Sequence, residues 1–312
     1  MDSKKIQRRQ FCFTYPAAAL AGLPLVRLLA AEPRWRPKYI LASSLYGTMD
    51  LAAILPQVRR TGTEHIDIWP APHANQRQQI DQIGHDRFLS LIQEHNVQLG
   101  IVSRYDLGPL GLADEMPIVS KLGARIIVCG SRGPANLTGD DLAAAVDRFA
   151  EQLKPHLEAA AEHNITIAIE NHANSLVCSP ESMYRLTDAI ASEHIGIALA
   201  PYHLPQDPDL IAAIIRRLGP RMVHFYAWQY GKGCHTEMPR EDELLQMPGR
   251  GAMDFGPIVA ALHATRYSGW VEVFMHPYQR GTPILPTPSE ITIEVNRARA
   301  YLAACLPKGS AS

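Results

Sequence analysis

Five polar residues lie at or near the ends of apolar runs of the sequence, and their types suit acid–base or metal chemistry. They are Glu170, His172, His203, His224 and His276. A carboxylate and imidazoles can move protons or ligate a metal ion. A carboxylate that closes an apolar run also needs a partner, because a buried unpaired charge is costly. These features predict a catalytic group made of Glu170, His172 and His203.

The apolar runs alternate regularly with segments of helical pattern. Several runs are continuously apolar, which is typical of strands buried on both faces of a parallel sheet. The predicted strands cover residues 39–42, 65–69, 97–102, 125–129, 165–170, 195–199, 222–226 and 270–274. The predicted helices cover residues 50–60, 85–95, 113–122, 140–163, 180–191, 208–218, 255–265 and 288–306.

Eight strand–helix units are the number that closes a (β/α)8 barrel, the TIM barrel of the α/β class. Barrel enzymes place their chemistry at the carboxyl ends of the strands, where the five polar residues fall. An open, doubly wound sheet is the alternative. No GxGxxG motif follows the first predicted strand, so we expect no nucleotide cofactor.

Four segments together resemble one barrel family. They are the strand end 167–172, His203, the pair 223–224 and the loop 247–255. In order and spacing they are similar to the xylose isomerase-like barrels, which include sugar phosphate isomerases and epimerases and endonuclease-IV-like proteins. The resemblance covers nearly the whole chain after residue 38.

The resemblance implies a divalent metal held by Glu, Asp, His and Glu after or on strands five to eight. Glu170 matches the first ligand and His224 the third. Ala200 occupies the Asp position and Phe274 the second Glu position, and neither side chain can ligate a cation. Two of the four usual ligands are therefore missing, and the two-base epimerase mechanism loses its second carboxylate. Glu272 lies one step deeper on the same strand face.

Histidines offer a replacement ligand set. Glu170 with His203, His224 and His276 would favour Zn²⁺, Mn²⁺ or Co²⁺ over Mg²⁺, since imidazole suits borderline metals. We expect a divalent metal on these grounds.

The resemblance implies a sugar-converting enzyme, and the residues favour a one-base reaction. Glu170 or a histidine would remove a proton next to a carbonyl, assisted by a metal or an imidazole. That chemistry serves a sugar isomerase or epimerase acting on a small sugar or keto-sugar. A lyase or dehydratase performing β-elimination is one alternative. A carbohydrate-binding barrel without catalysis is another, favoured by Ala200 and Phe274.

Aromatic and cationic side chains near the strand ends are candidate sugar contacts. Aromatic rings can stack on a sugar face, and cations can hold hydroxyls or anions. The expected substrate-binding residues are Trp69, Tyr202, Trp228, Lys232, Arg250 and Arg280, with Tyr105 as a further stacking candidate. Packing of the aromatics and solvation of the loop charges are the alternatives.

The charge balance excludes some partners. The 312 residues include 30 Lys and Arg against 31 Asp and Glu, a net charge of −1. Nucleic-acid binding usually needs a basic surface. We therefore expect a small-molecule substrate and no nucleic acid, which argues against the nuclease branch of the resembling family. A homo-oligomer is compatible with a large barrel.

The first 33 residues read as an export signal rather than as part of the fold. Arg8 and Arg9 precede an apolar stretch that ends in Ala30 and Ala31, a pattern that resembles a twin-arginine signal. Arg27 makes a stable membrane span unfavourable. We expect a signal peptide over residues 1–33, a barrel over 38–306 and a flexible tail over 307–312. The protein is then periplasmic, with a cytoplasmic location as the alternative and no permanent membrane span.

Overall fold

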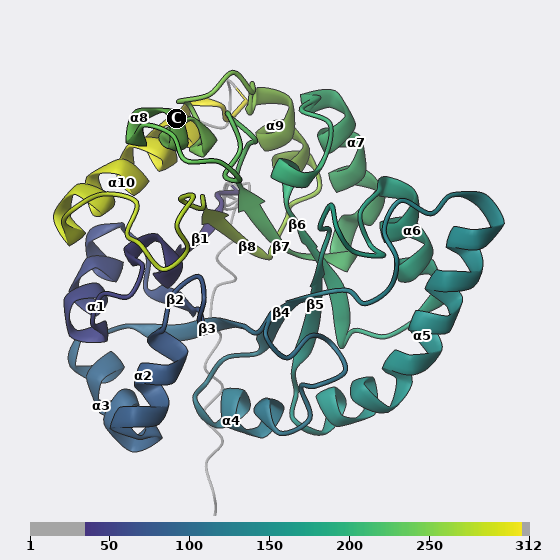
Figure 1. Ribbon diagram of the computed structural model, residues 1–312, viewed down its shortest axis with the longest axis horizontal. Helices are drawn as coiled ribbons and strands as arrows, with labels where there is room; N and C mark the ends of the chain where they lie inside the picture. The colour runs from purple at the N-terminus through teal and green to yellow at the C-terminus, as the bar shows by residue number, and fades with distance from the viewer. Residues whose placement is uncertain (1–34, 308–312) are drawn as a thin grey trace, which may run out of the picture. The chain divides into compact units, whose positions relative to one another are not determined.

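A computed structural model describes residues 35–307, and these residues form a closed parallel barrel (Figure 1). Each strand pairs with the next along the chain, and β8 pairs with β1. The strands are β1 (Lys38–Ala42), β2 (His65–Ile68), β3 (Gln98–Ser103), β4 (Ile126–Gly130), β5 (Thr166–Glu170), β6 (Ile195–Leu199), β7 (Met222–Ala227) and β8 (Trp270–Val273). The (β/α)8 fold expected from the sequence is confirmed.

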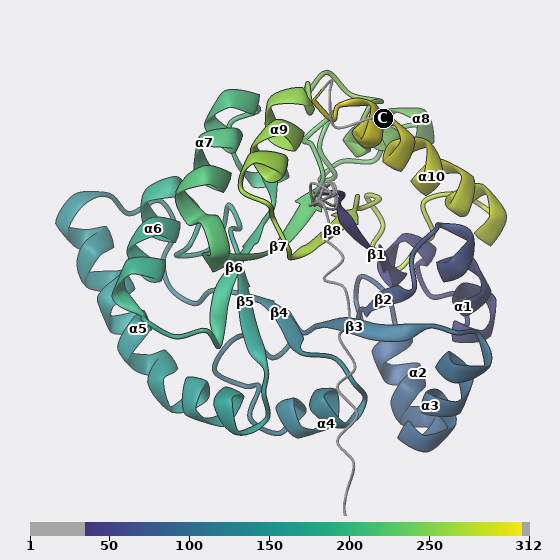
Figure 2. The same cartoon turned by 180° about the vertical axis from the view of Figure 1, so that it is seen from behind.

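Helices surround the barrel on its outside, as the front and back views show (Figure 1 and Figure 2). They are α1 (Leu51–Arg60), α2 (Gln76–Ile83), α3 (His85–Glu94), α4 (Glu115–Lys121), α5 (Gly139–Glu162), α6 (Pro180–Ala189), α7 (Pro208–Leu218), α8 (Arg240–Glu243), α9 (Gly256–Ala264) and α10 (Pro288–Ala304). The eight predicted helices are present within a few residues of the expected bounds.

Two short helices, α2 and α8, were not predicted. The α2 sequence is QRQQIDQI, in which glutamines hide the apolar periodicity that signals a helix. Its buried residues include Gln76, whose amide donates to the backbone oxygens of Gly47 and Met49. Helix α2 is therefore held to the loop after β1 by polar contacts, which hydrophobic periodicity cannot reveal.

Local sequence explains where the longer helices begin and end. At the start of α7, the Asp207 side chain accepts hydrogen bonds from the amides of Asp209 and Leu210, and Pro208 fills the first turn. Gly219, with φ of 51°, ends the same helix. Thr287 and Glu290 form a capping box that begins α10. These signals set where α7 begins and ends and where α10 begins, and so they set the lengths of the loops next to these helices.

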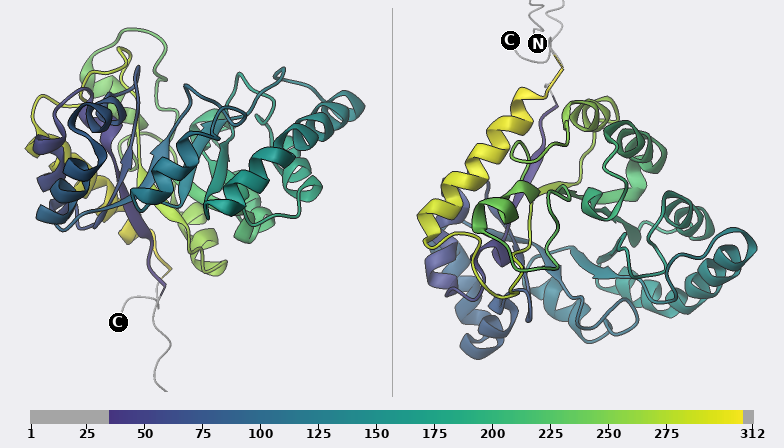
Figure 3. Two further views of the ribbon diagram at one scale, coloured as in Figure 1. Left: turned by 90° about the horizontal axis from the view of Figure 1, so that it is seen from below. Right: turned by 45° about the horizontal axis from the view of Figure 1, so that its top comes forward.

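The first and last strands close the barrel. Lys38 of β1 lies in register with Trp270 of β8, and its ammonium group lies 3.6 Å from the centre of the Trp270 ring. Outside this seam, α10 packs against α1, and Figure 3 shows α10 in yellow beside the purple start of the described chain. The first and last strands are thus joined in one closed sheet, and α10 packs against α1 outside it.

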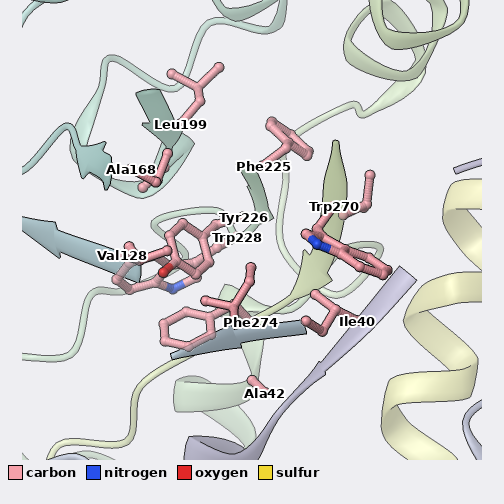
Figure 4. Close-up of a cluster of buried hydrophobic side chains, with 14 of the residues drawn as sticks. Ile40, Ala42, Val128, Ala168, Leu199, Phe225, Tyr226, Trp228, Trp270 and Phe274 are labelled. Carbon is pink, nitrogen blue, oxygen red and sulfur yellow. The ribbon is translucent and has the colours of Figure 1, made fainter. Parts of the chain in front are cut away.

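Large side chains fill the interior of the barrel near the carboxyl ends of the strands. Tyr226, Trp228 and Phe274 gather there, and Figure 4 shows them together. The Phe274 ring centre lies 4.9 Å from that of Tyr226 and 5.0 Å from that of Trp228. This aromatic group separates the mouth of the barrel from its deeper interior.

Some expectations concern parts of the chain that the structure does not describe. The signal peptide predicted over residues 1–33 lies outside the described residues, as do residues 308–312 of the predicted tail. Export therefore stays a prediction. From Trp35 to Pro307, no helix combines the length and the apolar character needed to cross a bilayer.

Candidate active site

A cavity of about 210 Å³ lies at the carboxyl ends of the strands, where barrel enzymes carry their chemistry. Its lining combines aromatic rings, imidazoles, one carboxyl group and one guanidinium. The lining residues are Trp69, His73, Tyr105, Glu170, His172, Tyr202, His203, Trp228, Cys234, His235, His276 and Arg280. A larger hollow of about 480 Å³ lies at the amino ends of the strands, but no acid is among the described residues that line it.

Glu170 is the carboxyl group of the cavity, and it ends β5. Its side chain is almost entirely buried, and burial raises its pKa to about 8. A hydrogen bond from Tyr105 opposes this shift, and the charge of the deeper Glu272 adds to it. Glu170 is therefore mostly protonated at neutral pH, and its titration falls in the range where enzymes use acid–base groups.

Two histidines flank Glu170. The Nε2 atom of His203 lies 3.8 Å from Glu170 Oε1, and the His203 and His172 rings are 4.1 Å apart. The amide of Asn174 donates to His172 Nδ1, which places the proton of the neutral ring on Nε2. Burial lowers the pKa of both histidines, that of His203 to about 3. Both are neutral near pH 7 and can donate a hydrogen bond to a substrate oxygen.

A second histidine pair forms another wall. The rings of His73 and His276 stack with centres 4.4 Å apart. Burial lowers the pKa of His73 to about 4 and that of His276 well below its usual value. The ring of His276 meets Trp69, Trp228 and Phe274 edge-on. These aromatic neighbours hold the imidazole in a fixed orientation.

Aromatic side chains complete the cavity. Tyr202 and Trp228 stack with ring centres 4.0 Å apart and an angle of 11° between the planes. Trp228 Nε1 donates to Gln246 Oε1, which fixes the indole. Trp69 stacks on Tyr105 at 5.2 Å. Flat apolar surfaces of this kind suit one face of a sugar ring.

A separate polar cluster lies deeper in the barrel. His224 Nε2 lies 3.0 Å from Glu272 Oε2, and Ser103 Oγ donates to Asp67 Oδ2 at 3.0 Å. All four side chains are fully buried. Burial raises the pKa of Asp67 and of Glu272 well above their usual values and lowers that of His224 to about 3. Tyr226 covers this cluster, with its ring centre 4.3 Å from that of His224.

The deep cluster predicts a loss of stability at alkaline pH. Asp67 and Glu272 hold protons in the folded state that the unfolded chain releases near pH 4, so stability falls as pH rises above that value. His224 opposes this only below about pH 6.5, where the unfolded chain alone binds its proton. Above about pH 4 we expect the free energy of unfolding to fall by up to about 1.4 kcal/mol per pH unit for each proton that the folded state retains.

Urea titrations at a series of pH values would measure this dependence. Glu272→Gln, which carries no titratable proton, should reduce the slope of stability against pH above about pH 4. An equal slope in the variant and the parent would contradict the assignment of the retained proton to this pair.

The structure separates some of the residues that the sequence brought together. Glu170, His172, His203 and His276 share the cavity, as do the predicted sugar contacts Trp69, Tyr202, Trp228 and Arg280. His224 does not line the cavity, because its strand position places it beneath Tyr226 and against Glu272.

Two predicted substrate contacts also lie away from the cavity. Lys232 is mostly exposed and pairs with Asp242 at 2.8 Å. Arg250 binds Glu294 of α10 through two hydrogen bonds. Both charges are therefore used within the protein, outside the cavity lining.

Three residues that line the cavity are not predicted from the sequence. His73 lies in the loop between β2 and α2, and Cys234 and His235 lie in the long loop after β7. The Cys234 thiol lies 3.1 Å from the Tyr202 hydroxyl. His73 follows a predicted strand end by a few residues, which was an available signal. Nothing in the sequence pattern places the other two.

The donors of the cavity do not fit a metal ion as they are arranged. Ala200, at the end of β6, is fully buried, and its backbone is held by the Asn171 side chain through two hydrogen bonds. Phe274 occupies the end of β8, and His224 lies below. Within residues 35–307, no three His, Cys, Asp or Glu side chains lie close enough together to share an ion. The expected ligand set of Glu170, His203, His224 and His276 is therefore not assembled.

Comparison with known proteins relates most of the barrel to one family model. The model described as Xylose isomerase-like TIM barrel matches residues 55–297. A search of curated proteins found no match.

Solved structures share the fold at low sequence identity. D-psicose 3-epimerase with D-tagatose from Clostridium cellulolyticum H10 is 15% identical with a TM-score of 0.65, covering 86% of this chain and 99% of that chain. The IolI protein with a zinc atom is 14% identical with a TM-score of 0.62, covering 86% and 98%. The probable 3-DHS dehydratase AsbF from Bacillus anthracis is 14% identical with a TM-score of 0.61, covering 87% and 100%. At these identities the likeness concerns the fold.

Proposed function

The chain belongs to the xylose isomerase-like TIM barrel family, and from that premise we propose that it is a sugar isomerase or epimerase acting by proton transfer next to a carbonyl. The observation that carries the proposal is Glu170, the one carboxyl group among the described residues that line the cavity. The small volume of about 210 Å³ suits a single sugar or keto-sugar.

The reaction can be written with the chain's own groups. The Glu170 carboxylate takes the proton from the carbon next to the carbonyl, and the electron pair forms a carbon–carbon double bond. The carbonyl oxygen takes a proton from a neutral imidazole, His203 or His172, giving an enediol. The imidazole then recovers a proton from the second hydroxyl, and Glu170 returns its proton to the former carbonyl carbon. The net result is an aldose–ketose exchange.

Return of the proton to the original carbon on its other face would instead give an epimer. Two-base epimerisation needs a second group on the opposite side of the substrate. Phe274 supplies none at the end of β8, so an imidazole such as His276 would serve. Both outcomes share the first step, and the proposal rests on that step.

Solvent exchange tests the first step directly. The purified protein is incubated in deuterium oxide with a panel of aldoses, ketoses, keto-sugars and the acid derivatives of these sugars, and NMR follows deuterium entering at the carbon next to the carbonyl. We expect exchange with at least one sugar. Absence of both exchange and product across the panel would contradict the proposal and favour a binding protein without catalysis.

The pKa of Glu170 predicts the pH dependence of the reaction. As a base, Glu170 acts only when ionised, and its pKa is about 8. We therefore expect kcat/KM to rise about tenfold per pH unit below pH 8 and to level off above it. Initial rates measured from about pH 6 to about pH 10 would show this. A rate that falls through pH 8 would instead assign Glu170 the role of an acid.

A lyase or dehydratase is the second candidate, and one feature favours it. The cavity has a single carboxyl group with imidazoles beside it, which suits removal of a proton by one group and protonation of a leaving oxygen by another. β-Elimination from a keto-sugar would produce an unsaturated product. The same NMR experiment distinguishes it, because new olefinic signals would replace simple exchange.

A further inference from the structure

Arg280 is the permanent cation of the cavity, and no acid among residues 35–307 pairs with it. Its Nη1 donates to the backbone oxygen of Pro277 at 2.5 Å, and its Nη2 lies 3.2 Å from Cys234 Sγ. Over residues 35–307, no carboxylate lies within ion-pair distance of it. The guanidinium carries more N–H donors than these two contacts use.

Three other arginines buried or partly buried in the barrel bind acids. Arg77 and Arg104 bind Glu115, and Arg250 binds Glu294. Arg280 differs from these three in that it lines the cavity and contacts no carboxylate of the described residues. Since guanidinium is well matched to carboxylate and phosphate, an open one marks a place for an anionic group.

The surroundings of Arg280 leave its charge uncompensated. Its charge helps to lower the pKa of His73, His172, His203 and His276, so it acts across the whole cavity. Glu170 is mostly protonated at neutral pH, because burial raises its pKa. The cavity thus presents one positive charge that no neighbouring group offsets.

We propose that the substrate is a sugar acid whose carboxylate binds Arg280 while its sugar ring occupies the aromatic part of the cavity. The inference rests on the proposed function, because it names the substrate class for the same site. A carboxylate is planar and carries one negative charge, which one guanidinium matches through two parallel hydrogen bonds.

A phosphate fits this cavity less well. A phosphate monoester carries a charge of about −1.5 to −2 at neutral pH, whereas Arg280 is the sole Arg or Lys among the described lining residues. The cavity of about 210 Å³ must also hold the sugar ring. The charge balance and the space both favour the smaller, singly charged group.

Calorimetric titration of matched ligands tests the proposal. The probes are D-glucose, D-glucuronate, the uncharged methyl ester of D-glucuronate and D-glucose 6-phosphate, with the galacto and manno series in parallel. We expect one uronate to bind about tenfold or more tightly than its neutral sugar and its ester. The ester comparison uses the parent protein, so it does not depend on any variant folding.

Arg280→Gln should abolish the preference for the uronate, and Arg280→Lys should retain part of it. Arg217→Gln is the matched control, because Arg217 lies on the surface in a pair with Asp188. Equal affinity for uronate and neutral sugar, a preference that survives Arg280→Gln, or tighter binding of the phosphate would each overturn the proposal. So would failure of every probe to bind.

The outcomes separate this inference from the proposed function. Deuterium exchange with neutral sugars and no preference for the uronate would support the proposed reaction and overturn the sugar acid as substrate. Uronate binding through Arg280 with no deuterium exchange on any probe would support the sugar acid as ligand and contradict the proposed reaction.

Discussion

Glu170→Gln is expected to lower kcat for proton exchange by a factor of about 10² to 10⁴, the usual contribution of a general acid–base group. Glutamine keeps the shape of the side chain but cannot accept the proton. The effect should fall on kcat more than on KM, because the amide still fills the same place beside His203. Initial rates from NMR or a coupled assay would measure both constants.

Glu162→Gln makes the same chemical change at an exposed position near the end of α5 and should leave kcat unchanged. The variant at 170 should also fold, and its removal of a buried acid should not lower the melting temperature. Retention of full exchange activity in Glu170→Gln would rule out Glu170 as the base and direct attention to the histidines.

His224→Leu is expected to reduce the free energy of unfolding by about 1 to 3 kcal/mol, the cost of leaving a buried polar group without its partner. The substitution leaves the Glu272 carboxyl fully buried without the imidazole that lies 3.0 Å away. Glu272→Leu alone should be destabilising for the corresponding reason. The double variant should be more stable than the sum of the single losses predicts, since it removes both buried polar groups together.

Urea denaturation of the four proteins of this cycle would give the coupling energy. His156→Leu provides a matched control, because His156 lies half-buried on α5 and should change stability by less than about 0.5 kcal/mol. Strict additivity of the two single substitutions would show that His224 and Glu272 do not act as a pair. A stable and unaltered His224→Leu would contradict the account of the deep cluster.

Much of the fold could be predicted from the sequence, because most strand residues are buried on both faces and most of the longer helices have one apolar side. The alternation of the two patterns therefore survives in a single sequence, and eight repeats specify a closed barrel. The same alternation does not predict helix α2, because hydrogen bonds from Gln76, rather than an apolar stripe, hold this helix in place.

Only part of the candidate site could be predicted from the sequence. Most of the missed placements concern how deep in the barrel a side chain lies. Glu170 is the last residue of β5, and His203 lies in the short turn just after β6, so their positions in the chain place them at the mouth. His224 lies within a strand, and whether it reaches the mouth depends on the stagger between strands, which a sequence does not display. Tyr226, two residues later on the same face, lies between His224 and the cavity instead.

Residues of the long loop after β7 could not be placed from the sequence, for a different reason. Cys234 and His235 belong to no periodic element, so no pattern indicates which way the loop folds. Their return to the cavity depends on tertiary contacts such as the one between Cys234 and Tyr202.

The seam between β1 and β8 has a consequence for synthesis on the ribosome. Translation delivers β1 first and β8 last of the strands, so one edge of β1 stays unpaired until residues 270–273 have emerged. An exposed strand edge can pair with other chains. The nascent barrel therefore carries an open strand edge through nearly all of its elongation, and it closes only after β8 has left the exit tunnel.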